Sequence, residues 1–578
     1  MPPSGIRLIQ EAQLLKDSPK KERRKCPPHQ FGSKFQKEVQ VTICAILVDL
    51  CEKFTFFGIV CNMILFCTIK LGYYNYQAAM INLCFMGTYM MTPALMDWLA
   101  ECPERRLKLV YICALLHFIG TALLPVVAFP FEDFFIDKRY VVHTLAKREQ
   151  MILFYIGLVA TCLGSGGIRA IVCPLRLCNL NEPGPKELMT FFNWFYWLVN
   201  LGSAIVFVSI SYIQQSVAKN LGFLIPFVSV LMALITIHMA RSEMIYQPSK
   251  GSSLLTVYGV VANSLKVCCV KCRYFSENVT NWLDHAKENY GGQYSETQVE
   301  STKMFVRLFP FFAFQVLYRM CLMQIPSGYY LQAINSTLNL NGFLVPIAAM
   351  NLISILPFLI LAPFLECLST CLFNAKTSGW SPTMCIVVGY TFAALSVMVA
   401  GFFEVHRKHF PSVEQTVSGK VLLVSSMPCV HLAPQYILLG VAEALVTPTC
   451  SFIIFQFVPS RIRGVAMQVS TFFSGAGSIM GAFFIQVVYF GSQGDWFPNI
   501  LNEGKLERFY FFLASLMMIN TLGFWIISHR YNNLRQDYDE GFRGSLLQEQ
   551  LLQHEKSLKF YDSILDCPSP LSPVENPL

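Results

Sequence analysis

Long apolar runs recur along the chain and dominate its pattern. Each is about 18 residues or longer, enough for an α-helix to cross the roughly 30 Å apolar core of a bilayer. The predicted spans are 39–69, 76–98, 107–128, 151–174, 189–213, 221–240, 304–326, 342–365, 380–402, 432–457, 464–490 and 507–528. The runs are continuously apolar rather than alternating, which favours helices over the strands of a membrane barrel. The sequence therefore predicts an all-α membrane protein with about twelve transmembrane helices.

A polar stretch divides these runs into two sets of six. The expected domains are a basic tail at 1–37, a six-helix bundle at 38–240, a linker at 241–302, a second six-helix bundle at 303–530 and a polar tail at 531–578. This layout resembles the major facilitator architecture, which holds solute near the midplane between its two bundles. Within the linker, Leu254, Val257, Val261 and Leu265 fall on one helical face. They predict an amphipathic helix lying against the membrane surface.

Composition supports the membrane class and excludes others. Hydrophobic residues make up 54% of the chain and charged residues only 14%, too few charges to cover a soluble protein of this length. The net charge of +8 comes from basic residues beside the apolar runs, so nucleic-acid binding is not expected.

The distribution of basic residues predicts the orientation in the membrane. Loops on the cytoplasmic side of a membrane protein are richer in Lys and Arg, and this bias predicts that both termini are cytoplasmic. Asn335 begins a glycosylation sequon on the predicted outer side. A plasma-membrane and an endolysosomal location both stay open.

Charged side chains inside a span are costly and therefore mark candidate functional positions. The first span contains Asp49, Glu52 and Lys53, and its two acids lie three residues apart on one helical face. Such a group either neutralises itself and fixes helix packing, or responds to a proton and to the charge of a solute. The sequence has no nucleophile–base pattern, metal-ligand spacing or phosphate loop. We therefore expect neither an enzyme nor a metal site or organic cofactor.

Five motifs in chain order resemble those of the proton-coupled oligopeptide transporter family. They are the first-span stretch from Asp49 to Gly58, Gly164-Ser-Gly-Gly-Ile-Arg169, Phe195-Tyr-Trp-Leu-Val-Asn-Leu-Gly-Ser203, the linker sequences Leu283-Asp-His-Ala286 and Thr297-Gln-Val-Glu300, and Pro434-Gln-Tyr436 followed by Glu443. Together they extend over about residues 40–470. The resemblance implies a transporter of the major facilitator fold that uses the proton as its coupling ion.

The resemblance also implies roles for individual residues. Asp49 and Glu52 match the family's proton-coupling acids, and Lys53 matches an arginine that receives the peptide carboxylate. Arg169 matches a lysine that pairs with an acid of the seventh span. The implied substrate-binding residues are Lys53, Phe56, Phe57, Arg169, Tyr196, Asn200, Gln324, Asn351 and Phe452.

Several of these positions depart from the family pattern. Lys53 replaces a forked guanidinium with a point charge, and Phe56 and Phe57 replace two tyrosines. The acid expected in the seventh span falls on Gln324 or Met323, and the acid of the tenth span falls on Phe452. A phenylalanine offers an ammonium at most a cation–π contact.

Three further ionisable residues have simpler explanations. Glu443 is expected to hydrogen-bond within its bundle, and His117 and His431 are expected to be packing or interface residues. Arg319 has two open interpretations: it faces the central cavity and balances Glu52, or its side chain extends toward a membrane interface.

The resemblance favours a proton-coupled symporter of di- and tripeptides with an altered substrate site. Two alternatives remain: a transporter of non-peptide anions, and a membrane sensor or scaffold that binds solute without moving it. The expected partners are a small-molecule solute, peptide or organic anion, and the lipid bilayer.

Overall fold

The computed structural model describes residues 28–99, 103–128, 146–172, 185–216, 224–245, 253–271, 281–290, 292–340, 342–374, 381–417, 420–459 and 462–528. Most of both predicted tails lies outside these residues. So do the side chains of Arg105, Arg106 and Arg461, which contributed to the predicted orientation.

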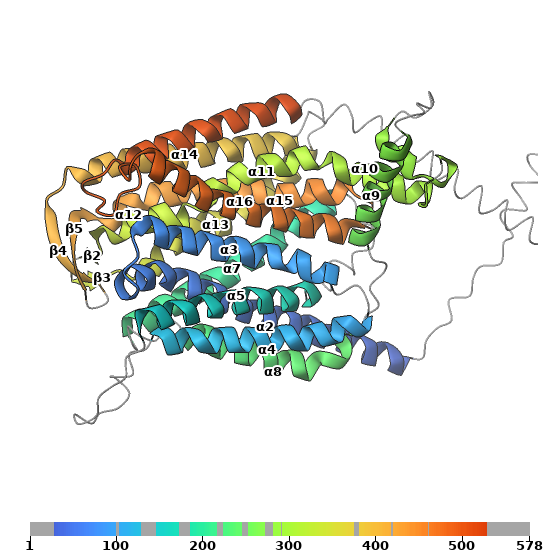
Figure 1. Ribbon diagram of the computed structural model, residues 1–578, viewed down its shortest axis with the longest axis horizontal. Coiled ribbons are helices and arrows are strands. Elements are labelled where there is room, and N and C mark those ends of the chain that lie inside the picture. The colour runs from blue at the N-terminus through green and yellow to red at the C-terminus, as the bar shows by residue number, and fades with distance from the viewer. Residues whose placement is uncertain are drawn as a thin grey trace, which may run out of the picture.

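The first half of the chain forms a layer of long, nearly parallel helices (Figure 1). They are α2 (Pro28–Leu65, continued by a π-helical turn, Phe66–Lys70), α3 (Asn75–Leu99), α4 (Pro103–Ala128), α5 (Lys147–Val172), α7 (Pro185–Ser216) and α8 (Leu224–Ile245). The expected sixth span corresponds to α8, whose apolar part, Leu224–Met239, is shorter than the others.

The second half forms the other layer of the molecule (Figure 1). Its helices are α11 (Phe309–Leu322), the π-helical η6 (Ile325–Tyr329), α12 (Tyr330–Ile334), α13 (Ile347–Asn374), α14 (Pro382–Lys408), α15 (Ala433–Phe457), α16 (Arg463–Gly491) and the helix Leu506–Ser528. Among the described residues, 11 helices are long and apolar enough to cross a membrane. The predicted all-α membrane fold is confirmed.

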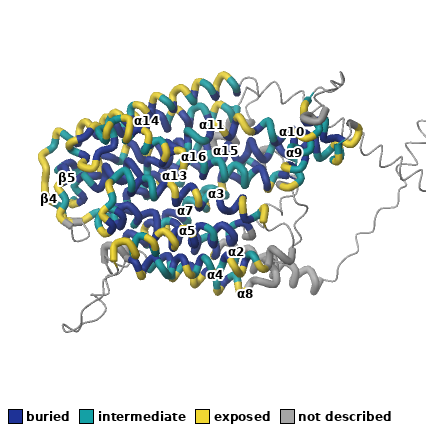
Figure 2. Tube along the Cα trace, viewed as in Figure 1, coloured by how far each residue is buried: buried dark blue, intermediate teal, exposed yellow. Residues whose placement is uncertain are grey.

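The two halves meet along helices that pack closely because small residues face each other. A Cβ atom on Gly87 of α3 would lie 2.8 Å from the carbonyl oxygen of Gly475 on α16, so these helices approach almost to backbone contact. At one end of this seam, the rings of Tyr76 and Tyr489 stack with centroids 3.6 Å apart. Burial is concentrated along the middle of the molecule (Figure 2). Large apolar side chains such as Ile360, 70% exposed, cover the outer faces, where lipid would contact them.

A small sheet, which the sequence did not predict, covers one end of the second half. Strands β1 (Ser336–Thr337), β4 (Ser412–Val417) and β5 (Lys420–Pro428) pair in the order β1-β5-β4, and β2 (Asn339–Leu340) pairs with β3 (Phe343–Leu344). A fully buried ion pair fixes this end: Arg407 donates to Glu404 Oε1 and Oε2 over 2.7 and 3.0 Å, and to the Asn335 carbonyl over 3.1 Å.

This sheet also holds the predicted glycosylation sequon. The Asn335 amide donates to the Leu331 carbonyl over 2.8 Å, and the Thr337 hydroxyl donates to the Ser425 carbonyl over 2.9 Å. The Asn335 side chain is therefore engaged by α12, and that of Thr337 by β5. Glycosylation stays a prediction.

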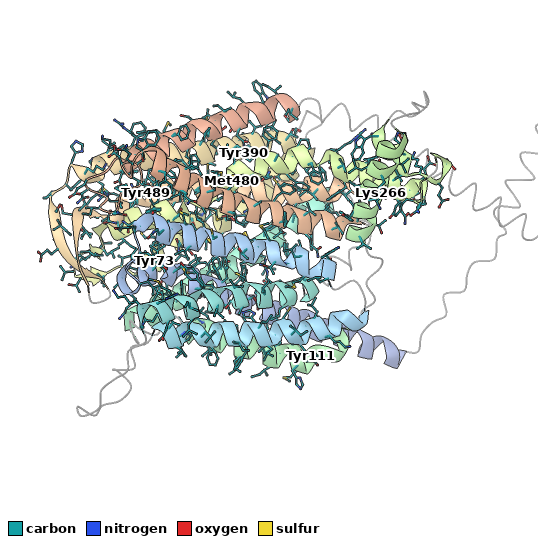
Figure 3. The ribbon with its side chains drawn as sticks, viewed as in Figure 1. Tyr73, Tyr111, Lys266, Tyr390, Met480 and Tyr489 are labelled. Carbon is teal, nitrogen blue, oxygen red and sulfur yellow. The ribbon has the colours of Figure 1, made fainter. Side chains whose placement is uncertain are left out.

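The linker lies beyond the end of the helices that is opposite the sheet, and we call this end the linker end. It contains α9 (Ser253–Lys271), the 3-10 turns η4 (Trp282–Ala286) and η5 (Glu288–Tyr290), and α10 (Glu296–Arg307), which leads into α11. The apolar stretch Glu296–Ile334 has 39 residues, about 58 Å of helix, nearly twice what a bilayer core requires. Figure 3 places Lys266 on the linker, far from Tyr73 and Tyr489 at the other end.

The predicted amphipathic helix exists as α9, but protein covers part of its predicted lipid face. Val257 is 7% exposed, and Val261 packs against a buried cluster that contains Val260, Leu283 and Val299. The linker brings apolar residues of its own, so it shields this face without lipid. Leu265, by contrast, is 51% exposed.

Five charged linker residues hold η4 against α10. Asp284 Oδ1 accepts from Lys303 Nζ over 2.5 Å and lies 3.0 Å from Lys287 Nζ, and Lys287 also contacts Glu296 and Glu300 over 3.1 and 2.8 Å. Burial acts to raise the pKa of Asp284, but the two lysines outweigh it and lower that pKa. Burial acts to lower the pKa of Lys287, but its three acidic partners outweigh it and raise that pKa. Both groups are therefore held in their charged forms.

Candidate functional site

Glu52 lies at the centre of the first half, where four helices meet. Its side chain on α2 is buried, and Oε2 accepts hydrogen bonds from Ser165 on α5 over 2.6 Å and from Tyr89 on α3 over 3.1 Å. Oε1 lies 3.4 Å from Nδ1 of His117 on α4 but forms no hydrogen bond with the described residues. Both ring nitrogens of the fully buried His117 likewise lack a hydrogen-bond partner there. A carboxylate and an imidazole therefore face each other with spare hydrogen-bonding capacity.

The glycines of the fourth-span motif allow this arrangement. A Cβ atom on Gly164 would lie 2.4 Å from the His117 backbone nitrogen, and one on Gly166 would lie 2.2 Å from Thr92 of α3. Such distances are far below van der Waals contact, so only glycine lets α5 approach α4 and α3 this closely. This approach brings Ser165 to Glu52. The motif that resembled a family signature therefore also has a direct packing role.

Asp49 and Lys53 lie beside Glu52 on α2 but face another neighbour. Lys53 Nζ donates to the Val199 carbonyl of α7 and lies 3.9 Å from Asp49, whose side chain is 37% exposed. Gly202 leaves room for the ammonium, since a Cβ there would lie 3.3 Å from Nζ. These two residues join α2 to α7, whereas Glu52 joins α2 to α3, α4 and α5.

Phe56 and Phe57 belong to an aromatic layer next to this group. The Phe56 ring packs on Tyr89 with centroids 4.6 Å apart, and Phe57 packs on Phe207 of α7 at 4.4 Å. Arg169 lies over the same Tyr89 ring, 4.8 Å from its centroid, and donates to the Tyr89 carbonyl over 3.4 Å. Arg169 therefore contacts an aromatic ring of its own half.

Gln324, at the position expected for the acid partner of Arg169, has its neighbours in the second half. Its Nε2 donates to the Met320 carbonyl over 3.1 Å, and its Oε1 lies near Gly328, which in turn lies beside the Tyr510 hydroxyl. Gln324 is buried, and Oε1 has no hydrogen-bond partner among the described residues.

Of three other predicted residues, two lie where the halves meet. The Tyr196 hydroxyl of α7 hydrogen-bonds to the Ser451 hydroxyl of α15 over 2.7 Å. Asn351 of α13 donates to the Cys61 sulfur of α2 over 3.7 Å, while Asn200 donates to the Tyr196 carbonyl of its own helix. Tyr196 and Asn351 thus connect the two halves.

A cavity lined by one charged and several hydroxyl side chains lies at this junction, which we call the Arg319 cavity. It encloses roughly 430 Å³ of space not filled by atoms. Its lining residues are Tyr196 of α7, Gln315 and Arg319 of α11, Thr447, Cys450 and Ser451 of α15, and Met467, Ser470, Thr471 and Ser474 of α16. Arg319 lines this cavity, as the first of its two interpretations expected, but no described contact joins it to Glu52. The acid in electrostatic reach of Arg319 is Glu443, one helical turn before Thr447.

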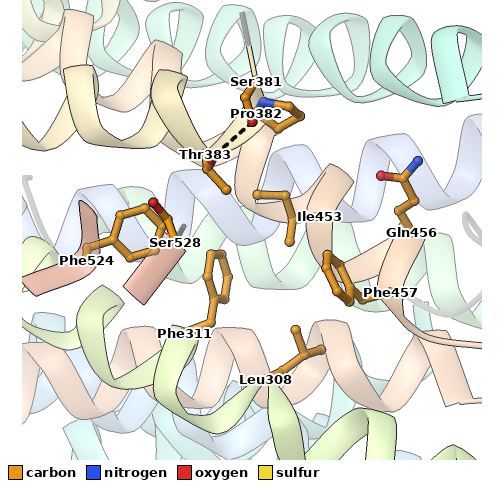
Figure 4. A pocket seen from close by; sticks show the side chains of 10 residues that line it. All are labelled: Leu308, Phe311, Ser381, Pro382, Thr383, Ile453, Gln456, Phe457, Phe524 and Ser528. Atoms are coloured by element: carbon orange, nitrogen blue, oxygen red, sulfur yellow. Dashed lines mark hydrogen bonds between the residues drawn. The ribbon is translucent and has the colours of Figure 1, made fainter. Parts of the chain in front are cut away.

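A second pocket, of about 570 Å³, lies among helices of the second half (Figure 4). Leu308, Phe311, Ile453 and Phe457 give it an apolar lining, and none of its lining residues is charged. Phe452 is buried in the hydrophobic core and lines neither pocket. Its predicted contact with solute has no support from this geometry.

Several site residues were not predicted. His117 was interpreted as a packing residue, and Ser165 and Tyr89 were not considered, although Ser165 stands inside the glycine motif. The hydroxyls of α16 left a readable signal, because Ser470 and Ser474 are one helical turn apart within an apolar span. The described residues contain no cluster of three or more potential metal ligands.

Comparisons with known proteins agree with this architecture. A sequence profile described as the POT family matches residues 107–497. The chain is 58% identical to human solute carrier family 15 member 5 over 542 residues, which cover 94% of each chain. It is 24% identical to mouse solute carrier family 15 member 3, over 85% of this chain and 91% of that protein.

Solved structures of similar fold are also transporters. One is described as an auto-inhibited POT family peptide transporter, with a TM-score of 0.63, 18% identity and coverage of 85% of this chain and 97% of that one. Another, a POT family transporter in complex with 5-aminolevulinic acid, has a TM-score of 0.58, 14% identity and coverage of 84% and 96%. These identities establish the likeness of fold alone.

Proposed function

Because the chain belongs to the POT family of membrane transporters, we propose that it is a proton-coupled symporter of small solutes that carry a carboxylate. Di- and tripeptides fall within this class, as do other small organic acids. The proposed orientation puts the linker and both termini in the cytoplasm, following the basic residues of the sequence.

The observation that carries the proposal is the environment of Glu52. Ser165 and Tyr89 can both donate to the ionised carboxylate, and His117 stands 3.4 Å from the remaining oxygen. An imidazole can accept or release a proton near neutral pH, so the pair has room for one exchangeable proton. A carboxylate needed only for packing would not require an imidazole left without other partners. The proposal therefore assigns proton binding to Glu52 together with His117.

Other charged and titratable groups lie on the helices that meet at this pair and on the neighbouring α8. They are Asp49 and Lys53 on α2, Tyr89 on α3, Cys113 on α4 and Arg169 on α5, while His238 of α8 is exposed. Arg169 and Lys53 each have contacts elsewhere. Proton transfer between Glu52 and His117 would leave those contacts in place.

The test is uptake by the full chain in proteoliposomes with an imposed inward proton gradient. Labelled dipeptides, amino acids and small carboxylates are offered in turn. We expect gradient-driven accumulation of at least one carboxylate. Replacing Glu52 by Gln should reduce it at least tenfold, within the range usual for loss of a proton-transfer group. Exchange of labelled for unlabelled solute should continue, because exchange needs no net proton movement.

Asp49→Asn is the matched control, since it removes an acid from the same helix without touching the buried group. We expect accumulation to stay within about threefold of wild type. Equal accumulation by wild type and Glu52→Gln would contradict the assignment of coupling to Glu52. Binding of solute with no flux under any gradient would instead favour the sensor alternative.

A further inference from the structure

The Arg319 cavity contains a positive charge that the described protein does not neutralise by direct contact. Arg319 Nε is buried without a hydrogen-bond partner, and no described carboxylate forms an ion pair with the guanidinium within 4.0 Å. Its aromatic neighbour is the Tyr318 ring, with the centroid 5.9 Å away. A guanidinium stays charged at any physiological pH, so it cannot lower the cost of burial by losing a proton. Such a group requires an anion or polar partner from elsewhere.

A second polar atom in the same lining also lacks a partner. The Thr447 hydroxyl is buried and forms no hydrogen bond with the described residues. It therefore adds a free O–H donor to the N–H donors of Arg319. Two unsatisfied donors in one cavity at the junction of the halves are the arrangement a carboxylate would complete.

The part of the lining that α16 forms offers acceptors. The Thr471 hydroxyl donates to the Met467 carbonyl over 3.1 Å, and the Ser474 hydroxyl donates to the Ser470 carbonyl over 3.0 Å. With their protons engaged, these oxygens can accept from a ligand N–H or O–H. No Asp or Glu lines the cavity, so nothing in the lining requires the ligand to carry a free ammonium.

We propose that the Arg319 cavity binds the carboxylate of a small organic acid that also carries N–H or O–H donors, and that a free amino terminus is not required. This inference rests on the proposed function and names its substrate class. Arg319 would hold the carboxylate, with Thr447 beside it and the α16 hydroxyls receiving the ligand's donors.

Glu443 provides a test in which two substitutions should change ligand affinity in opposite directions. It lies within electrostatic reach of Arg319 but forms no ion pair with it within 4.0 Å, and it does not line the cavity. A ligand carboxylate would compete with Glu443 for the same positive charge. Removing that competitor should strengthen binding, whereas removing Arg319 should weaken it.

Binding is measured on the full chain in detergent without a proton gradient, by the shift of thermal unfolding and by equilibrium dialysis. The probes are alanyl-alanine, its C-terminal amide, N-acetyl-alanyl-alanine and N-acetyl-alanine. We expect both acetylated acids to bind within about threefold of alanyl-alanine or more tightly. The amide should bind at least tenfold more weakly, because it loses a charge-assisted hydrogen bond.

The variants give the decisive comparison. Arg319→Gln should weaken binding of N-acetyl-alanyl-alanine at least tenfold, Arg319→Lys should weaken it less, and Glu443→Gln should leave it equal or tighter. The proposal is overturned if folded Arg319→Gln binds as wild type does, if the amide binds as well as the acid, or if wild type binds none of the acids. Loss of binding in both Arg319→Gln and Glu443→Gln would mean that the two residues only stabilise each other, and this result would also overturn the proposal. Binding that follows the expected pattern without proton-driven uptake keeps this site and rejects the symporter proposal.

Discussion

Glu52 in the first half and Arg319 in the second half are membrane-embedded charges in opposite kinds of surroundings. In the first half, Glu52 accepts hydrogen bonds from Ser165 and Tyr89 on two other helices and faces His117 on a third, and glycines bring these helices together. In the second half, Arg319 faces a cavity, and its nearest electrostatic partner, Glu443, makes no direct contact with it. A preorganised acid suits a small ion such as a proton, whereas an open cation suits a larger ligand that supplies its own charge. This contrast is the reason why we propose proton coupling in the first half and solute recognition at its junction with the second.

The largest expected effect tests whether helix packing holds the Glu52 site together. Gly166→Ala would place a methyl group 2.2 Å from Thr92 Cγ2, so α5 must move away from α3. Overpacking of this kind costs about 1–3 kcal/mol. We expect a lower midpoint of thermal unfolding in detergent and weaker gradient-driven uptake, because Ser165 moves away from Glu52.

Gly464→Ala provides the matched control, since a Cβ at Gly464 would meet nothing within 4 Å. Alanine is the better helix former, so this variant should be as stable as wild type or up to about 1 kcal/mol more stable. Equal stability of the two alanine variants would show that α5 does not need its close approach to α3, and the packing explanation of the Glu52 site would be wrong.

The architecture was predictable because apolar length and charge distribution are local properties of the sequence. Glu52 was found for a related reason, since charge inside an apolar run is visible without knowing the fold, whereas Arg169 was found through the resemblance of its glycine motif to a family signature. His117 was not, because its importance depends on which face of α4 meets α2 and α5, and that is decided by the glycines of another helix. The lining of the Arg319 cavity comes from four helices spread over nearly 300 residues, and no local pattern connects them.

The sheet at the end of the second half was missed for a different reason. Ser412–Val417 and Lys420–Pro428 contain β-branched residues, which favour strands, but neither segment alternates polar and apolar residues regularly, and the sequence analysis predicted no element between the spans 380–402 and 432–457. The linker was partly predicted: a helix forms there as expected, and lipid was expected to cover its apolar face, whereas Leu283 and Val299 lie against part of that face and Leu265 is exposed.

An intermediate effect tests whether His117 belongs to the proton site or only fills space. His117→Phe keeps a ring of similar size and removes both nitrogens. If the imidazole shares the proton of Glu52, the ratio of gradient-driven uptake to exchange should fall about tenfold, at the low end for a lost acid–base group. The same substitution at the exposed His431 should leave the ratio unchanged. An unchanged ratio in a folded His117→Phe protein would confine coupling to Glu52 and make the histidine a packing residue.

The smallest expected effect concerns the pH dependence of the linker. Its charges are directly paired, so it serves as the reference for the charges of both halves. The pKa of Asp284 is lowered in the fold, so its stabilising contribution is present above its unfolded value of about 4 and is lost as the pH falls below that value. The pKa of Lys287 is raised, so its contribution is present below about 10.4 and is lost as the pH rises through the higher folded value. The linker should therefore be insensitive to pH between about 5 and 10.

Below about pH 4, hydrogen exchange of the Leu283–Lys287 amides, corrected for intrinsic rates, should accelerate about threefold, as expected for pairs near a surface. Asp284→Asn should abolish this acid-dependent step, and amides beside the exposed Asp495–Lys505 pair should show little of it. Acceleration already near pH 7 would mean that the linker charges respond to the same protons as the membrane site, and the distinction between paired and open charges would not hold.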